Sequence, residues 1–191
     1  MHQRIIGITG GIATGKTTVS NYLSKVYALP ILDADLYARS AIGSELLSLL
    51  VKRYGQIILD RDRNLDRSQL ASIIFQDRTE RDWLEGQIHP YVRDRLIDRS
   101  VSYAPNTVVM VIPLLFEANM TDLVTEIWVV ACSPEIELQR LIDRNQLSVE
   151  DAQIRIAAQL PLAEKIDRAD IVLDNSGNLE DLYAQIDRSV Q

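Results

Sequence analysis

The chain is poor in cysteine, and this excludes a framework of disulfides. Of its 191 residues only Cys132 is a cysteine, and only two are histidines. A disulfide needs two cysteines, and a structural zinc site needs several cysteine or histidine ligands. Cys132 lies in the apolar run 127–132. We therefore expect a buried, unreactive thiol rather than a ligand or a nucleophile.

The chain also lacks a long apolar run. A helix that crosses a bilayer needs about 20 apolar residues, and the apolar runs here are far shorter. The first of them begins as early as Ile5, which leaves no room for a charged leader followed by an apolar segment. We expect no signal peptide, no membrane contact, and a location in the cytoplasm.

Positive charge is in the minority. Lysine and arginine number 20 against 27 aspartates and glutamates, which gives a net charge of −7. A protein that coats nucleic acid needs a basic face, so this class is disfavoured. A local basic pocket for a phosphorylated small molecule stays open. Hydrophobic content of 47% is enough for a folded core, as one domain with insertions or a domain with a lid.

The stretch from Gly10 to Thr18 carries the strongest functional signal. Gly10, four residues, Gly15, Lys16 and Thr17 fit the phosphate-loop pattern. Glycine lets successive backbone N–H groups turn inward around a phosphate, the lysine supplies a mobile cation, and the threonine hydroxyl suits Mg²⁺. The nucleotide-binding residues expected here are Gly11, Ile12, Ala13, Thr14, Gly15, Lys16, Thr17 and Thr18.

The residues on either side of this loop support the interpretation. Before it, 5–9 is a short apolar run typical of a buried parallel strand, and after it apolar residues recur at helical spacing up to about Tyr27. A strand, a glycine turn and a helix would place the phosphates at a helix N-terminus, where unpaired N–H groups and the helix dipole favour anions.

A second strand, 29–32, is followed by two acidic residues. Ligands bind at the carboxyl end of strands in an open parallel sheet, so Asp33 and Asp35 are candidates for the site. For Asp35 an equal alternative is a cap of the following helix. The third strand, 107–112, ends at Pro113 where such folds usually have a metal-binding aspartate. We therefore assign the metal carboxylate to Asp33.

The block 41–101 is mostly helical and too long for a plain crossover between strands. It predicts a helical insertion that forms a substrate wall. Its last helix begins near Thr79 and contains Trp83, which we expect in the core rather than on a ligand. Pro90 follows His89, and a proline in such a pattern predicts a helix end or kink.

Two more apolar runs, 126–132 and 169–173, complete a set of five short strands alternating with helices. This alternation predicts a parallel sheet covered by helices on both faces.

Helix starts at Ser133-Pro134 and at Ser148 are signalled by their capping residues. The first of these helices carries Arg140 and Arg144, four apart on one face. Each arginine alone fits a solvated face, but together they favour a lid over a nucleotide.

Taken together, these segments resemble the dephospho-coenzyme A kinase family over essentially the whole chain. The phosphate loop identifies only a nucleotide-binding superfamily. Three other segments together are specific for the family: Asp-Ala-Asp at 33–35, His-Pro at 89–90 and Pro-Leu-Leu-Phe-Glu at 113–117. The matching segments are 9–12, 33–35, 84–90, 113–117, 139–141 with Arg144, 155–156 with Gln159, Lys165, and 169–175.

The resemblance implies a P-loop kinase in three parts that phosphorylates the 3′-hydroxyl of dephospho-coenzyme A with ATP and Mg²⁺. Asp33 would be the base that accepts the hydroxyl proton, and Thr17 with Asp33 would hold the metal. Lys16, Mg²⁺ and Arg140 would stabilise the developing charge. The expected parts are a nucleotide-binding core at 1–54, 106–134 and 166–191, an acceptor-binding insertion at 55–105, and a lid at 135–165.

The resemblance also implies acceptor contacts at Asp35 and His89 and an adenine-side role for Asn175. The sequence departs from the family pattern at Ala13, where the loop often has glycine, and at Asn145, where aspartate is common. The expected partner is the small-molecule substrate, and the expected assembly a monomer or small homo-oligomer. Alternatives are another nucleoside or nucleoside-monophosphate kinase, and a nucleotide-dependent switch, although the sequence has no guanine-reading motif.

Overall fold

We describe a computed structural model of the chain that covers residues 3–191, without the side chains of Ser44, Phe75 and Gln76. The chain divides into two compact units. One comprises the residues up to 34 together with 96–191, and the other comprises 35–95. Each unit is described in its own frame.

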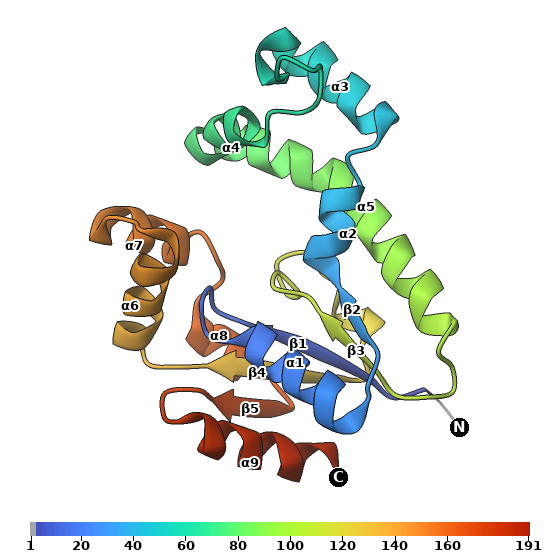
Figure 1. The fold of residues 1–191 in the computed structure, drawn as a ribbon, viewed down its shortest axis with the longest axis vertical. Helices are drawn as coiled ribbons and strands as arrows, with labels where there is room; N and C mark the ends of the chain where they lie inside the picture. The colour runs from blue at the N-terminus through green and yellow to red at the C-terminus, as the bar shows by residue number, and fades with distance from the viewer. Residues whose placement is uncertain (1–2) are drawn as a thin grey trace. The chain divides into compact units, whose positions relative to one another are not determined.

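The first unit is built on a five-stranded sheet in which every neighbouring pair of strands is parallel. The strand order is β2-β3-β1-β4-β5 (Figure 1), so the strand before the phosphate loop is central. Central parallel strands are buried on both faces, which explains why they read as continuous apolar runs. This confirms the predicted sheet. The strands are β1 (Ile5–Gly10), β2 (Ile31–Asp33), β3 (Val108–Val111), β4 (Glu126–Ala131) and β5 (Ile171–Asp174).

One face of the sheet is covered by α1 (Lys16–Tyr27) and α9 (Leu179–Val190), which also contact each other. Tyr22 of α1 stacks on Tyr183 of α9, with ring centroids 4.1 Å apart. The Tyr22 hydroxyl donates to Asp187 Oδ1 at 2.9 Å, which fixes the two helices side by side. The buried core beneath them is Ile6, Ile8, Val19, Leu23, Val109, Val111, Trp128, Val130, Leu173, Leu182 and Ile186.

The opposite face is covered as well. Side chains alternate between the faces of a strand, so Thr9 points away from the face that holds Ile8. Thr9 Oγ1 donates to the Pro113 carbonyl at 3.0 Å, and the same carbonyl accepts from Lys165 of α8 (Leu162–Ile166) at 3.4 Å. Helix α8 packs on β4. Both faces of the sheet therefore carry helices, as predicted.

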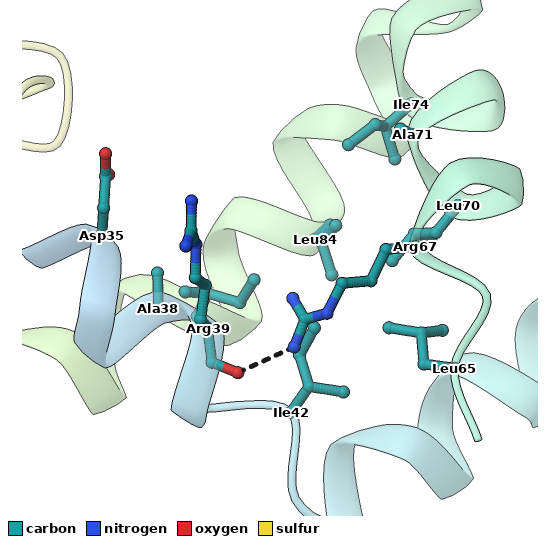
Figure 2. Close-up of a pocket in the computed structure, with 11 residues that line it drawn as sticks. Asp35, Ala38, Arg39, Ile42, Leu65, Arg67, Leu70, Ala71, Ile74 and Leu84 are labelled. Carbon is teal, nitrogen blue, oxygen red and sulfur yellow. Dashed lines mark hydrogen bonds between the residues drawn. The ribbon is translucent and has the colours of Figure 1, made fainter.

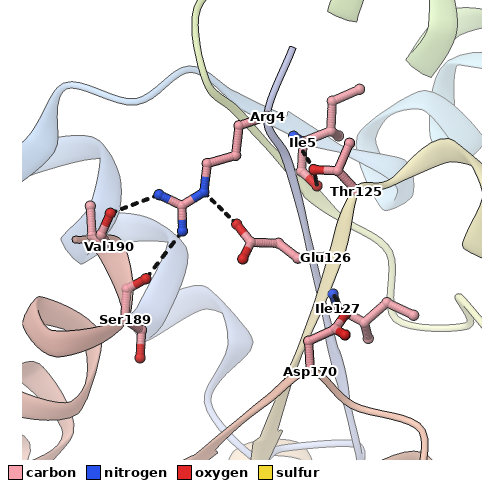
Figure 3. Close-up of polar contacts among 8 residues, drawn as sticks. All are labelled: Arg4, Ile5, Thr125, Glu126, Ile127, Asp170, Ser189 and Val190. Atoms are coloured by element: carbon pink, nitrogen blue, oxygen red, sulfur yellow. Dashed lines mark hydrogen bonds and ion pairs between the residues drawn. The ribbon is translucent and has the colours of Figure 1, made fainter. Parts of the chain in front are cut away.

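An arginine joins the start of β1 to the end of the chain (Figure 3). Arg4 Nε pairs with Glu126 Oε1 of β4 at 2.6 Å, and its Nη1 and Nη2 donate to the carbonyls of Val190 and Ser189. Those carbonyls are the unpaired acceptors of the last turn of α9, so a guanidinium is well matched to them.

Two helices follow β4 and precede α8: α6 (Pro134–Asn145) and α7 (Val149–Ala157), which pack against each other. Ser133 Oγ accepts from Ile136 N and Ser148 Oγ accepts from Asp151 N, so both predicted N-caps are confirmed. We call α6 and α7 the arm. Its role as a lid stays a prediction.

The second unit is helical and has its own core. Its helices are α2 (Ala34–Ser40), α3 (Ser44–Tyr54), η1 (Gly55–Ile58), α4 (Arg67–Gln76) and α5 (Arg78–Val101), of which α2 begins and α5 ends in the first unit. The core contains Leu46, Leu50, Ile58, Leu70 and Leu84. Trp83 packs against this core, in agreement with the prediction. The unit starts before the predicted insertion at 55–105 because α3 contributes two of these leucines.

Helix α5 runs from Arg78 to Val101 with Pro90 inside it. Of the two predicted outcomes at His89-Pro90, a helix end is therefore wrong, and a kink stays a prediction. Proline removes one hydrogen bond of the helix, and buried residues on both sides, Leu84 and Val92, hold the chain in place through packing.

Within residues 3–191, every helix is too short or too polar to span a membrane.

Candidate nucleotide site

The phosphate loop connects β1 to α1 and takes the backbone conformations for which glycine is suited. Gly10 has φ 144° and Gly15, which precedes the first residue of α1, has φ 106°. A side chain at Gly10 would overlap the carbonyl oxygen of Val130 on the neighbouring strand, and one at Gly15 would overlap Asn175 Nδ2. Both glycines are therefore required by the local packing as well as by the turn.

Ala13 has φ 61°, which lies in the left-handed region that costs an alanine about 1 kcal/mol or more. Ala13→Gly should relieve this strain, and because glycine is more flexible in the unfolded chain, the net gain is below that figure. We expect a melting temperature higher by about 1–3 °C, measured by calorimetry without nucleotide. Gly43→Ala provides the control, since Gly43 has a negative φ and open space around it. A lower melting temperature for Ala13→Gly would contradict the strain argument.

The loop is braced from within and from β5. Thr14, which is fully buried, donates from Oγ1 to the Gly11 carbonyl at 2.9 Å. Asn175, at the end of β5, donates from Nδ2 to the Thr14 carbonyl at 2.7 Å. The Asn175 side-chain N–H thus supports the loop, a function that its predicted adenine-side role did not include. The sequence signals only a turn at this position.

A hollow of about 670 Å³ opens beside the loop. It is bounded by the loop, the first turn of α1, one side of α6 and the turn that follows β5. The lining residues are Ala13, Gly15, Lys16, Thr17, Thr18, Arg140, Asp143, Arg144, Asn175 and Leu179. Seven of the expected nucleotide residues are among them, and the remaining three, Gly11, Ile12 and Thr14, belong to the loop itself. The volume is in the range of about 300–1,000 Å³ usual for small-molecule sites.

Cations line two sides of this hollow. Lys16 Nζ lies at the mouth of the loop, where it donates to the carbonyls of Gly11 at 2.6 Å and Gly10 at 3.2 Å. From the arm, Arg140 lines the opposite side, and its Nη1 is buried without a hydrogen-bond partner in residues 3–191. Arg140 as a whole is half-buried and lines the hollow, so its positive charge favours an anionic ligand there. Arg144 Nε donates to Asn145 Oδ1 at 2.9 Å, so the asparagine still pairs with the arginine.

Cys132 is buried beneath Arg140 at the end of β4, as predicted. Burial raises the pKa of its thiol, against the opposing effect of the Arg140 charge. The thiol therefore stays protonated at neutral pH and unreactive.

Glu137 is a residue beside the loop that the sequence did not predict. It lies in the first turn of α6, is 5% exposed, and its carboxylate contacts the backbone of Gly11. Burial raises the pKa of this carboxyl, and the charges of Lys16 and Lys165 oppose that rise. The available signal was its spacing: Glu137 and Leu141, four apart, are the two buried residues of α6.

Asp33 is the last residue of β2 and is half-buried. It pairs in register with Val111 of β3, and β3 is the neighbour of β1. Asp33 and the phosphate loop therefore lie at the same carboxyl edge of the sheet, two strands apart, where ligands of parallel sheets bind (Figure 1). Asp33 does not line the 670 Å³ hollow.

Asp35 and His89 belong to the second unit. Asp35 is exposed in the first turn of α2, which begins at Ala34, so it is not the residue that caps this helix. His89 is half-buried in α5. Asp35 lines a hollow of about 280 Å³ within the unit, and His89 does not.

A parallel sheet, a phosphate loop that opens α1 and an arm that carries arginines define a P-loop kinase. The family model "Dephospho-CoA kinase" matches residues 4–181. The chain is 57% identical over 189 residues to the dephospho-CoA kinase of Trichormus variabilis, which covers 98% of this chain and 96% of that protein. The chain belongs to the dephospho-CoA kinase family.

Two solved structures agree with this fold. The Thermus thermophilus protein TT1252 superposes with a TM-score of 0.82 at 38% identity, over 100% of this chain and 97% of that one. Dephospho-CoA kinase from Campylobacter jejuni superposes with a TM-score of 0.73 over 98% of this chain and 95% of that one. At 24% identity the second comparison supports the fold alone.

Proposed function

We propose that this chain transfers the γ-phosphoryl group of ATP to the 3′-hydroxyl of dephospho-coenzyme A. Membership of the family supports the reaction, and one observation supports the nucleotide site. That observation is the hollow of about 670 Å³ in which the phosphate loop and Lys16 face Arg140 of the arm. Phosphoryl transfer needs positioned cations around the transferred group more than covalent help from the protein, and this hollow provides them.

In this proposal the backbone N–H groups of the loop hold the β- and γ-phosphates at the N-terminus of α1. Lys16 turns its ammonium from the loop carbonyls toward the outer phosphates. Arg140 lines the hollow from α6, and its guanidinium is the proposed donor to the phosphoryl oxygens, where charge develops during transfer.

Mg²⁺ fits the residues at this edge of the sheet. Thr17 is exposed and lines the hollow, and Asp33 ends the strand two places from β1. A hydroxyl and one carboxylate are hard oxygen donors, and Mg²⁺ typically takes one or two such ligands with waters and substrate phosphates. When bound, the ion neutralises phosphate charge.

Asp33 is also the proposed base. Its carboxylate would accept the proton of the acceptor hydroxyl as that oxygen attacks the γ-phosphorus, and the bond from the γ-phosphorus to the bridging oxygen of ADP breaks. The position of Asp33 at the carboxyl edge of β2, beside the strands that carry the loop, supports this role.

We assign part of the acceptor to the hollow in the second unit (Figure 2). The hollow is lined mainly by apolar side chains, together with Arg39 and Arg67. Arg67 Nη2 donates to the Arg39 carbonyl at 3.1 Å. Dephospho-coenzyme A carries a diphosphate next to a long pantetheine chain, which matches guanidinium groups beside apolar side chains. At about 280 Å³ the hollow suits one end of the acceptor rather than all of it. Asp35 and His89 stay the predicted acceptor contacts.

Arg67→Gln should raise the KM for dephospho-coenzyme A about tenfold, because a hydrogen bond to a charged group contributes about 1.5–3 kcal/mol and this side chain is exposed. The kcat and the KM for ATP should change little. Arg78→Gln is the matched control, since Arg78 is a highly exposed arginine of the same unit that pairs with Asp82 and does not line the hollow. Equal effects of the two substitutions would remove the diphosphate from this hollow.

The reaction itself is tested by ADP release with ATP and Mg²⁺. Dephospho-coenzyme A is compared with adenosine, AMP, CMP and no acceptor, and GTP with ATP as the donor. We expect rapid release only with dephospho-coenzyme A. Turnover with a nucleoside or a monophosphate instead would favour another P-loop kinase, and slow turnover independent of any acceptor would favour a switch.

We also propose a cytoplasmic location and a monomer or small homo-oligomer. The single buried thiol suits a reducing compartment, and the net charge of −7 disfavours nucleic acid as a partner. Light scattering coupled to size exclusion would measure the assembly.

A further inference from the structure

Lys165 is a fully buried charged residue that the proposed reaction does not use. It lies in α8, directly after the arm, and its side chain is 0% exposed. A buried ammonium is strongly unfavourable unless it is paired and hydrogen-bonded. Lys165 Nζ lies 2.8 Å from Glu117 Oε1 and 3.4 Å from the Pro113 carbonyl. The side chain is therefore fixed by two oxygens of one turn, the segment 113–117 after β3.

Glu117 holds the base of the arm at a second point. The same oxygen, Oε1, accepts a hydrogen bond from Leu160 N at 3.0 Å. Leu160 lies between the end of α7 and the start of α8. The Glu117 carboxylate therefore holds the backbone of the segment that connects the arm to α8. One side chain thus fixes both Leu160 and Lys165.

The turn is itself tied to the phosphate loop. The Pro113 carbonyl that accepts from Lys165 also accepts from Thr9 Oγ1 at 3.0 Å. Thr9 is fully buried in β1 and directly precedes Gly10, the first residue of the loop. A continuous chain of polar contacts therefore runs from the return of the arm, through the turn, to the strand that carries the loop.

Glu137 lies near the same buried lysine from the side of the arm. Its carboxylate contacts Gly11 of the loop, and the positive charges of both Lys16 and Lys165 act on it. Both ends of the arm, the start of α6 and the return at Leu160, are thus joined to the loop through charged groups around Lys165.

We infer that Glu117 and Lys165 form a positioning pair for phosphoryl transfer, which fixes the base of the arm to the strand behind the phosphate loop and so holds Arg140 over the phosphates. The inference rests on the proposed function of the nucleotide site. Neither residue touches the reacting atoms. A misplacement of a catalytic group by about 1 Å can cost up to about a hundredfold in rate. A rigid attachment of the arm can therefore offset the unfavourable burial of the Lys165 ammonium.

A double substitution separates this role from simple stability. Glu117→Leu alone leaves the fully buried Lys165 ammonium without its partner, which is strongly destabilising, whereas the Glu117 side chain is 23% exposed. Lys165→Met combined with Glu117→Leu replaces the pair by apolar side chains, a change that is often neutral for stability. This double variant loses the contacts to Leu160 and Pro113 while it keeps a packed interior.

The experiment measures kcat and the KM for ATP of the double variant, alone and with Arg140→Ala. We expect a melting temperature near that of the wild type, a kcat lower by about tenfold to a hundredfold, and a KM for ATP within about threefold. Arg140→Ala should cost about a hundredfold or more in the wild type and much less in the double variant, because the two changes remove one interaction. Arg168→Gln is the control, since the Arg168 side chain is exposed and its guanidinium carbon lies 4.1 Å from the centroid of the Phe116 ring.

Two results would overturn the inference: a wild-type kcat in a stable double variant, or an equal cost of Arg140→Ala in both backgrounds. If the double variant does not fold, Glu117→Gln takes its place, because it keeps an acceptor for Leu160 N and removes only the charge. It should also lower kcat about tenfold without a matching change in the KM for ATP.

Hydrogen exchange decides the inference independently of turnover. With ATP and Mg²⁺ present, amides of α6 and of 158–166 should exchange faster in the variants than in the wild type and the Arg168→Gln control. If the wild type does not act on dephospho-coenzyme A, the proposed function fails, while unchanged exchange in the variants would overturn the positioning pair.

Discussion

An Asp33→Asn variant is expected to bind ATP as the wild type does and to lose about a hundredfold or more of its turnover. An amide has nearly the shape of a carboxylate but cannot accept the proton of the attacking hydroxyl, and a positioned base contributes about 10²–10⁴ in rate. The main-chain position at the end of β2 should not change, because Asp33 is held there by pairing with Val111 of β3. Steady-state kinetics with dephospho-coenzyme A and an equilibrium ATP-binding assay measure the two properties separately.

A magnesium titration distinguishes the two proposed roles of Asp33. If the carboxylate acts mainly on the metal, the variant should recover much of its rate at high Mg²⁺. If it acts mainly as the base, the rate should stay low at every Mg²⁺ concentration. Asp167→Asn, at an exposed aspartate just after α8, controls for the loss of one negative charge. A near-normal rate of Asp33→Asn at ordinary Mg²⁺ would remove Asp33 from the base role.

Lys16→Ala should weaken both ATP binding and transfer. Lys16 lies at the first turn of α1 with its ammonium at the mouth of the loop, and no other lysine lines the hollow in residues 3–191. Loss of one donor aimed at developing charge typically costs about 10²–10³ in kcat, and the KM for ATP should also rise because the lysine is proposed to contact the phosphates before transfer.

Lys25→Ala on the same helix is the matched control. Lys25 lies in the last turn of α1, is exposed, and does not line the hollow, so its removal tests only the loss of a charge from this helix. Circular dichroism of both variants would show whether α1 is intact. Unchanged kinetics for Lys16→Ala would overturn the assignment of the loop.

The sequence by itself determined the fold and the phosphate loop at the centre of the proposed nucleotide site. Apolar runs with the length of strands, separated by helical periods, specify a parallel sheet because such strands must be buried on both faces. The loop at Gly10–Thr17 was readable because its conformation demands glycine at particular positions, and Gly10 and Gly15 indeed have positive φ. The helix starts at Ser133 and Ser148 could be predicted because an N-cap is a local hydrogen bond, between a side chain and a backbone N–H two or three residues later.

Only the tertiary structure decided which distant residues meet. The hydrogen bond from the Asn175 side chain to the Thr14 carbonyl joins residues 161 apart in sequence. The one from Lys165 to the Pro113 carbonyl joins residues 52 apart. Neither contact has a local pattern that would predict it. Likewise, Pro90 was expected to end or kink a helix, and the helix continues through it because packing of Leu84 and Val92 on either side outweighs the one hydrogen bond that proline removes. Local chemistry sets turns, caps and periodicity, whereas burial and long-range polar contacts depend on the folded arrangement of all the elements.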